Sequence, residues 1–432
     1  MPSGLRISLF VLAMLLLAAV TSVYVYRRGA KVLRLDRRGR WALGILLAIG
    51  PAAMMIARLF EASLPREVAA ALGVGGGAIL LGVWISTVLL WAVDLPFGLA
   101  RLARRGARES IVADAPVADA PVADAPAAPA PRDVAAARED DAGREDEPAP
   151  TPLAPLGRRE LVRTAATGAA LSVGFGASFY GALFGRHDYE VPEVPIAIPG
   201  LSRRLDGYRI AQLSDIHFGV YVGDAERRAA VELVRRARPD LVVLTGDLLD
   251  HDAAYAPQLG RLVRELEGLP IRDGVTIIAG NHDYYAGVDA VLGACRDGGG
   301  TVLRNQGRVL QGGIALLGVD DVWARRSNDG PGPDLAAAMA TVDPELPRVL
   351  LCHNPVFFEE ARGQVALQLS GHTHGGQVNL GVRPADLVLT YVSGRYDEHG
   401  STLYVNRGFG TAGPPARVGA RPEITLVVLG AA

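Results

Sequence analysis

The sequence predicts a group of membrane-spanning helices followed by one α/β or α+β domain. Long apolar runs without charge occur in the first 185 residues, whereas residues 186–432 alternate short β-branched runs with turns and helical segments. The averages of the chain, 432 residues with 50% hydrophobic residues and a net charge of −2, hide this division. Two cysteines exclude a disulfide scaffold and a cysteine-built zinc site.

Four apolar runs are long enough to cross a bilayer core, which needs about 20 apolar residues. Residues 7–26, 41–60 and 68–93 predict three transmembrane helices within a membrane region of residues 1–108. Residues 159–185 predict a fourth transmembrane helix or a twin-arginine-like signal anchor, because Arg158 and Arg159 precede the glycine- and alanine-rich run of residues 164–185. A buried core helix is the alternative for each run. A cleaved signal peptide ending at about residue 21 is a further alternative for the first.

Basic residues predict how these helices are oriented. Seven lie between the first two runs against one acid, four follow the third run, and three lie at the start of the fourth. Loops rich in lysine and arginine stay on the cytoplasmic side. The sequence therefore predicts a multi-pass protein of the bacterial inner (cell) membrane, with its last domain on the extracytoplasmic side.

Residues 109–158 predict a disordered acidic linker rich in alanine and proline. Residues 112–126 repeat Val-Ala-Asp-Ala-Pro three times, and residues 109–150 carry 11 acids against 3 arginines. Such a composition cannot bury enough apolar surface to fold. We expect a semi-extended cytoplasmic spacer.

Short apolar runs predict the buried strands of the last domain. They lie at residues 208–213, 240–244, 275–278, 349–352, 365–369 and 424–429, and an amphipathic helix is expected at residues 226–238. Polar motifs follow five of these strands: Ser-Asp-Ile-His, Thr-Gly-Asp, Ala-Gly-Asn-His-Asp, His-Asn-Pro and Ser-Gly-His-Thr-His. Because open α/β sheets bind ligands at the carboxyl ends of their strands, we expect one site there.

The polar residues of these motifs have the chemistry of metal ligands. Imidazole, carboxylate and amide groups without thiolates suit two hard-to-borderline divalent ions rather than a structural zinc. Alternation along a strand end can aim Asp215 and His217 at one ion, and the two oxygens of Asp247 can bridge two ions. The candidates are Asp215, His217, Asp247, Asn281, His282, His353, His372 and His374.

Taken in this order, the motifs resemble the calcineurin-like metallophosphoesterase superfamily over residues 207–430. The strings at residues 213–219, 370–377 and 407–411, with residues 421–424, are similar to its bacterial membrane-associated phosphodiesterase branch. That branch is related to UDP-2,3-diacylglucosamine pyrophosphatase-like enzymes. The resemblance implies an α+β fold, a four-layer αββα sandwich, in a catalytic domain of residues 186–432. It also implies a metal-dependent phosphoesterase.

The resemblance implies two divalent metal ions (Mn, Fe, Zn or similar) bridged by Asp247. The ligands of the first ion would be Asp215, His217 and His374. Those of the second would be Asn281, His353 and His372. His282 would be the general acid or transition-state stabiliser, oriented by Asp250. A shared water, made acidic by both ions, would attack phosphorus in line as hydroxide.

Other residues carry weaker predictions. Asp250 and Asp283 can instead have structural roles, and Arg407 is a surface arginine or a contact to a phosphate. Residues 320–333 form a flap over the substrate or an ordinary loop. Two cysteines are expected to be free and buried: Cys295 and Cys352. Three histidines in loops or turns are expected to be solvated: His187, His251 and His399.

Three functions fit this sequence. The first is a membrane-anchored phosphodiesterase acting on a lipid-linked or envelope phosphodiester. The second is a phosphohydrolase of soluble nucleotides or small phosphoesters, and the third is a non-catalytic membrane sensor or scaffold. The complete ligand set favours an enzyme over a sensor. Residues 186–432 carry 24 arginines against 30 acids, so the expected partners are the bilayer and a phosphoester, and no nucleic acid.

Overall fold

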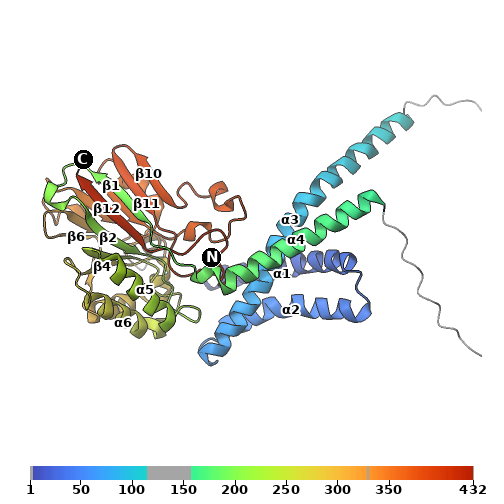
Figure 1. The fold of residues 1–432 in the computed structure, drawn as a ribbon, viewed down its shortest axis with the longest axis horizontal. Helices are drawn as coiled ribbons and strands as arrows, with labels where there is room; N and C mark the ends of the chain where they lie inside the picture. The colour runs from blue at the N-terminus through green and yellow to red at the C-terminus, as the bar shows by residue number, and fades with distance from the viewer. Residues whose placement is uncertain (1–2, 114–156, 328–329, 432) are drawn as a thin grey trace, which may run out of the picture. The chain divides into compact units, whose positions relative to one another are not determined.

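The structure, a computed structural model, describes residues 3–113, 157–327 and 330–431 (Figure 1). Most of the predicted linker therefore lies outside the described residues. The described chain divides into two compact units, one from Met1–Thr87 with Leu171–Ala432 and the other from Val88–Ala170. The first unit contains all the candidate metal ligands, so it is the unit that concerns the site.

Four long helices contain the predicted membrane spans. They are α1 (Ser3–Val32), α2 (Arg37–Leu59), α3 (Arg66–Ala113) and α4 (Arg158–Leu183). Four segments are long and apolar enough to cross a membrane: Leu12–Val32 in α1, Arg37–Leu59 in α2, Arg66–Pro96 in α3, and Glu160–His187, which continues past the end of α4. α3 continues to Ala113, so residues 109–113 are helical rather than part of a disordered linker. The alanines and arginines before them are strong helix formers, which extend the helix beyond its apolar part.

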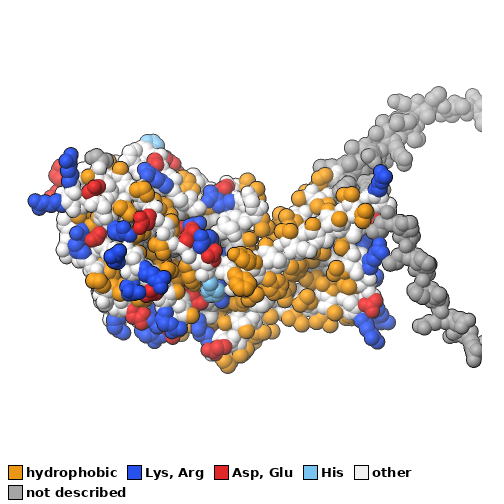
Figure 2. All heavy atoms as spheres, viewed as in Figure 1, with side chains coloured by type: hydrophobic (Ala, Val, Ile, Leu, Met, Phe, Trp, Pro, Cys, Tyr) orange, Lys and Arg blue, Asp and Glu red, His pale blue; other side chains and the backbone are white. Residues whose placement is uncertain are grey.

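Small residues let the helices of the first unit approach one another closely. In α3, Gly76 lies against the backbone of Gly50 in α2. In α4, the hydroxyl of Ser178 donates a hydrogen bond of 2.6 Å to the carbonyl oxygen of Ala78 in α3. Close backbone approach and hydrogen bonds between helices are the usual means of helix association in lipid. Figure 2 shows hydrophobic side chains over the visible faces of these helices, where many are exposed.

The described part of residues 186–432 forms two six-stranded sheets. Their strand orders are β1-β12-β2-β3-β4-β5 and β10-β11-β9-β8-β7-β6. The first sheet contains β1 (Glu193–Ile198), β12 (Thr425–Ala431), β2 (Tyr208–Leu213), β3 (Leu241–Thr245), β4 (Val275–Ile278) and β5 (Thr301–Val302). The second contains β10 (Gly394–Glu398), β11 (Ser401–Val405), β9 (Leu367–Ser370), β8 (Arg348–Leu351), β7 (Ala315–Gly318) and β6 (Gln306–Val309). Each strand predicted from the sequence is present.

Helices cover the outer faces of both sheets, which confirms the predicted αββα sandwich. The first sheet is covered by α5 (Asp224–Ala237), α6 (Ala256–Glu267) and α8 (Val288–Asp297). The second is covered by α10 (Leu335–Met339) and α11 (Phe358–Ala361). The apolar layer between the sheets includes Ile210 and Val243 from one sheet and Leu316 and Val349 from the other. Short 3₁₀ turns complete the chain at Gly185–His187, Arg203–Leu205, Ala253–Tyr255, Pro355–Phe357, His374–Gly376 and Pro384–Leu387.

Parallel pairing brings the predicted motifs to one edge of the sandwich. β2, β3 and β4 run parallel in the first sheet, as do β7, β8 and β9 in the second. Near the ends of β2 and β9, the side-chain amide of Gln212 donates a hydrogen bond of 3.0 Å to the carbonyl oxygen of Ser370. The carboxyl ends of the two sheets therefore meet, and the loops that follow them face a common space.

The layer between the sheets gives a test of the fold. Leu316 is fully buried there. Because Leu316→Ala removes apolar contacts and leaves a cavity, we expect the free energy of unfolding to fall by about 2–5 kcal/mol. The measurement is denaturant unfolding of the purified protein, with Leu387→Ala as control, since the Leu387 side chain is 87% exposed. Equal losses in the two variants would contradict the burial of Leu316.

Candidate metal centre

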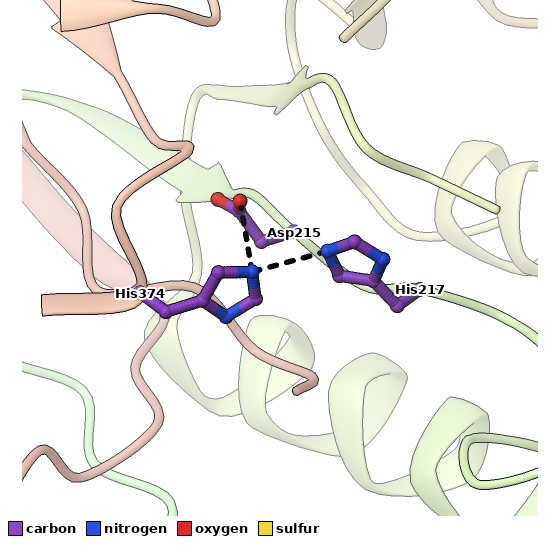
Figure 3. A group of neighbouring side chains, drawn as sticks. All are labelled: Asp215, His217 and His374. Carbon is purple, nitrogen blue, oxygen red and sulfur yellow. Dashed lines mark hydrogen bonds and ion pairs between the residues drawn. The ribbon is translucent and has the colours of Figure 1, made fainter. Parts of the chain in front are cut away.

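The structure gathers the predicted ligands into neighbouring groups just beyond the strand ends. Within each group, one candidate ligand atom per residue lies within 4.8 Å of the others. The first group is Asp215, His217 and His374, drawn in Figure 3. The second is Asp247, His353 and His372. The third is His217, Asp250 and His282. The first two groups correspond to the two ligand sets that the sequence implies.

An uncommon backbone conformation aims most of these side chains. Five of the candidate ligands have positive φ angles, between 51° and 74°. This left-handed conformation costs a non-glycine residue about 1–2 kcal/mol, and such strain is concentrated at functional sites. The five are Asp215, His217, Asp247, His372 and His374.

Hydrogen bonds between the loops hold these conformations. The N–H of Asp215 donates to the carbonyl oxygen of Gly246, and that of His217 donates to the carbonyl oxygen of Asp247, each at 3.0 Å. The N–H of His372, in the other sheet, is 2.9 Å and 3.0 Å from the two carboxylate oxygens of Asp215. Gly246 has a φ of +88°, and a side chain there would collide with the loop after β4. The loops of both sheets therefore brace one another at the site.

The first group has the donor set of a divalent ion. The Nε2 atoms of His217 and His374 are 3.1 Å apart, and the Nε2 of His374 is 3.4 Å from Oδ1 of Asp215 (Figure 3). A carboxylate oxygen and two imidazole nitrogens that converge in this way suit a metal such as zinc. The geometry fits the predicted first ion.

Unpaired buried atoms mark the second group. The Nδ1 of His353 is 2.8 Å from the carbonyl oxygen of Thr245 and donates to it, which leaves the Nε2 facing Oδ2 of Asp247 at 3.2 Å. Within the described residues, the Oδ1 of Asn281 and the Nδ1 of His372 have no hydrogen-bond partner. Leaving such atoms unpaired is costly. A metal ion would satisfy them, so these residues also fit the group that the sequence implies.

The charges of the site favour metal binding. Burial lowers the pKa of His372 and of His374, so both imidazoles are neutral near pH 7. Burial alone would raise the pKa of Asp247, but the charge on His353 and on the neighbouring histidines holds it well below its usual range. Burial alone would lower the pKa of His217 and of His353, but the neighbouring carboxylates raise both. Since neutral imidazole and ionised carboxylate are the forms that bind a metal ion, an ion that binds at these two histidines would displace their protons.

Asp250 contacts two histidines of the site. Its Oδ1 is 3.7 Å from the Nδ1 of His217 and 3.7 Å from the Nδ1 of His282. Its carbonyl oxygen is closer, 2.5 Å from the same nitrogen of His282. The main chain of Asp250 thus holds His282, while the carboxylate faces both rings. That Asp250 orients His282 in catalysis stays a prediction.

Asp283 holds the loops beneath the site. It is fully buried, and its carboxylate accepts hydrogen bonds from the N–H groups of Leu248, Leu249 and Gly280, at 2.9, 3.1 and 2.8 Å. These bonds tie the loop after β3 to the start of α7 (Asn281–Ala286). Of the two roles left open by the sequence, the contacts favour the structural one.

The remaining predictions have mixed outcomes. Arg407 is not a free surface arginine, because its half-buried guanidinium pairs with Glu190 and Glu423. Within residues 320–333, of which 328–329 lie outside the described residues, α9 (Val322–Ser327) carries Trp323. The ring of Trp323 is 5.6 Å from that of Tyr285. This contact does not test whether the segment covers a substrate, and the flap stays a prediction.

Both cysteines are free and buried, as predicted. The side chains of His187, His251 and His399 are exposed.

Three charged residues next to the site escaped sequence analysis. Arg417 is buried, with Nη2 3.1 Å from Nδ1 of His374. Arg58, at the end of α2, has Nη1 2.5 Å from Oδ2 of Asp250. Glu61 has Oε2 3.0 Å from Nε2 of His251, so this exposed histidine is paired rather than simply solvated. No local motif marks these residues, and the chain near Arg58 has the pattern of a membrane flank.

A two-sheet αββα sandwich with buried histidine and aspartate groups at the carboxyl ends of its strands defines a metal-dependent hydrolase domain. The family described as Calcineurin-like phosphoesterase matches residues 208–376. The "Uncharacterized metallophosphoesterase YkuE" of Bacillus subtilis is 30% identical over 287 residues, which cover 63% of this chain and 98% of that protein. The chain therefore belongs to the calcineurin-like metallophosphoesterases, as the motifs predict, and it is a metal-dependent phosphoesterase.

Two further relatives have different coverage. A "Transmembrane protein with metallophosphoesterase domain" from Danio rerio is 34% identical over 263 residues, 58% of this chain and 59% of that protein. An "Uncharacterized metallophosphoesterase" from Helicobacter pylori is 32% identical over 268 residues, 60% of this chain and 70% of that protein. The chain thus spans less than two thirds of the zebrafish protein's length.

The affinity for a metal ion tests the role of Asp247. Because its carboxylate lies between both ligand groups, we expect Asp247→Asn to weaken Mn²⁺ binding by about 10-fold or more. Isothermal titration of the metal-stripped protein measures the dissociation constant. Asp289→Asn is the control, since that side chain is 100% exposed. Wild-type affinity in Asp247→Asn would remove Asp247 from the metal centre.

The pairing of His251 predicts a pH dependence of stability. The Asp250 and Glu61 carboxylates raise the pKa of His251 to about 9. Because the folded pKa exceeds the unfolded value of about 6.5, the stabilisation is complete below pH 6.5 and is lost as the pH rises through 9. We therefore expect the Tm difference between wild type and His251→Ala to shrink between pH 6.5 and 9.5. His399→Ala controls for loss of an exposed histidine, and a pH-independent difference would contradict the pairing.

Proposed function

We propose that this phosphoesterase is a membrane-anchored enzyme with two divalent ions that hydrolyses a lipid-linked or envelope phosphodiester. The observation that carries the proposal is the placement of Asp247 between two ligand groups. Its Oδ2 is 3.8 Å from the Nε2 of His217 in the first group and 3.2 Å from the Nε2 of His353 in the second. A carboxylate shared in this way suits a pair of ions.

The residues of the centre would have distinct tasks in this reaction. When bound, two ions supply Lewis acidity that activates water and neutralises charge on the phosphoryl oxygens. The seven proposed ligands hold and orient them. The ring of His282 is 4.7 Å from that of His217, so it lies beside the first ligand group, where it would donate a proton to the leaving oxygen or stabilise its charge. The carbonyl oxygen of Asp250 keeps that ring in place through Nδ1.

We place the centre on the extracytoplasmic side of a bacterial inner membrane. Seven basic residues lie between the apolar parts of α1 and α2, whereas residues 60–67, which connect α2 to the start of α3, contain one arginine and two acids. The positive-inside rule then assigns that connection to the outer face. The ion pair between Arg58 and Asp250 supports this orientation, since it requires the end of α2 and the catalytic domain to lie on one side.

A lipid-linked or envelope substrate follows from this location. A centre beside the end of two apolar helices would meet phosphodiesters at the membrane surface. Soluble nucleotides and small phosphoesters are the alternative substrates, and the experiment below separates them. The name of the zebrafish relative, a transmembrane protein, supports the membrane location and no particular substrate.

Purified full-length protein with Mn²⁺ tests this function. We expect cleavage of bis-p-nitrophenyl phosphate and of UDP-diacylglucosamine-like lipids, and loss of both activities on chelation. Cleavage of p-nitrophenyl phosphate or nucleotides alone would overturn the phosphodiester proposal.

Two variants test the chemistry. Since His282 would transfer a proton and Asp247 would hold both ions, we expect His282→Ala and Asp247→Asn to lower kcat by about 10²–10⁴-fold. The control is His399→Ala, whose side chain is exposed on the turn between β10 and β11. Wild-type turnover by either site variant would refute its assigned role.

A further inference from the structure

The connection between α2 and α3 lies against the loop that carries Asp250. The Nη1 of Arg58 is 2.5 Å from Oδ2 of Asp250 and 3.1 Å from Nδ1 of His251. The carboxylate of Glu61 is 3.0 Å from the other ring nitrogen of that histidine. All four residues belong to the same compact unit. The helical region therefore contributes two charged side chains to the edge of the metal centre.

Several contacts hold Arg58 in this position. Its guanidinium carbon is 5.5 Å from the centre of the Tyr221 ring. That ring is buried and packs with Ala69 of α3 and with Val220. Further along the connection, the Nε of Arg66 donates a hydrogen bond of 3.4 Å to the carbonyl oxygen of Gly219. An arginine between an aromatic face and a carboxylate is permanently charged and already oriented for the ion pair.

Asp250 lies between Arg58 and two histidines of the metal centre. One carboxylate oxygen pairs with Arg58, while the other faces the Nδ1 atoms of His217 and His282, each at 3.7 Å. Carboxylates behind a metal-binding imidazole determine the orientation of its ring. The Asp250 side chain is 7% exposed, and a buried carboxylate that loses its cation is strongly destabilised. Movement of Asp250 would therefore disturb both imidazoles.

We propose that Arg58 is a positioning residue for phosphoester hydrolysis, which fixes Asp250 so that Asp250 orients His217 and His282. In this arrangement, the helical region holds the catalytic domain at the membrane and also supplies a side chain that orients residues of the metal centre. The inference rests on the proposed function, because it assumes that the reaction takes place at this metal centre.

Kinetics and metal binding of the full-length protein test the proposal. We expect Arg58→Ala to lower kcat for bis-p-nitrophenyl phosphate by about 10–100-fold, with a similar rise in the Mn²⁺ dissociation constant. The KM should change little, because Arg58 acts through Asp250. Arg58→Lys keeps the positive charge, so it should recover part of both losses. The matched control is Arg40→Ala, at the other end of α2, where the side chain contacts the carbonyl oxygen of Leu35.

A double-mutant cycle separates positioning from a general structural role. If Arg58 acts through Asp250, Arg58→Ala should cause no further loss of kcat in an Asp250→Asn background. Multiplied losses in the double mutant would overturn the proposal. A fall in Tm for Arg58→Ala without a change in the Mn²⁺ dissociation constant would also overturn it.

The two proposals fail in different ways. If the wild-type protein cleaves no phosphoester, the proposed function fails. The Mn²⁺ dissociation constants of wild type, Arg58→Ala and Arg40→Ala then decide the role of Arg58 without any turnover. A weaker constant in Arg58→Ala alone supports positioning of the metal ligands, and equal constants in all three refute it.

Discussion

The buried carboxylate of Asp247 is the constraint around which the domain is arranged. It lies between histidines from both sheets, and its Oδ1 accepts a hydrogen bond of 2.8 Å from the N–H of His282. Burying an ionised carboxylate is expensive unless charges or hydrogen bonds compensate it. The parallel strands of both sheets end at this point, so that one carboxylate meets donors from loops far apart in the sequence.

The loops that surround Asp247 have strained backbone conformations, and contacts within the sandwich stabilise these conformations. Five candidate ligands have left-handed backbones, which isolated loops of these residues would rarely adopt. Such conformations persist where the surrounding structure determines them. Here the hydrogen bonds accepted by Asp283 and those between the loops after β2 and β3 perform this task. The centre is therefore pre-organised by the rigid sheets beneath it.

The helical region contacts the loop of Asp250 through Arg58, and we propose that this contact links it to the chemistry. A membrane anchor that only located the enzyme would need no ion pair with Asp250, whereas Arg58 and Glu61 both reach the loop behind the metal ligands. The two acidic residues and single arginine of residues 60–67 are the basis for the proposed position of this connection on the outer face of the membrane. We thus propose that the connection between α2 and α3 serves two purposes. It lies on the side of the membrane where the enzyme acts, and the neighbouring Arg58 positions Asp250.

Local patterns in the sequence were sufficient for the strands, the superfamily and the set of candidate ligands. The strands at residues 208–213 and 275–278 match β2 and β4 because a short β-branched run between turns favours one conformation. The candidate ligands could be chosen because each motif is contiguous and follows a predicted strand. Contacts between distant segments were not predictable in this way. Arg58 and Asp250 are 192 residues apart, and Arg417 meets His374 only after the sheets have packed. Such pairs depend on packing in three dimensions, which no local period of the chain encodes.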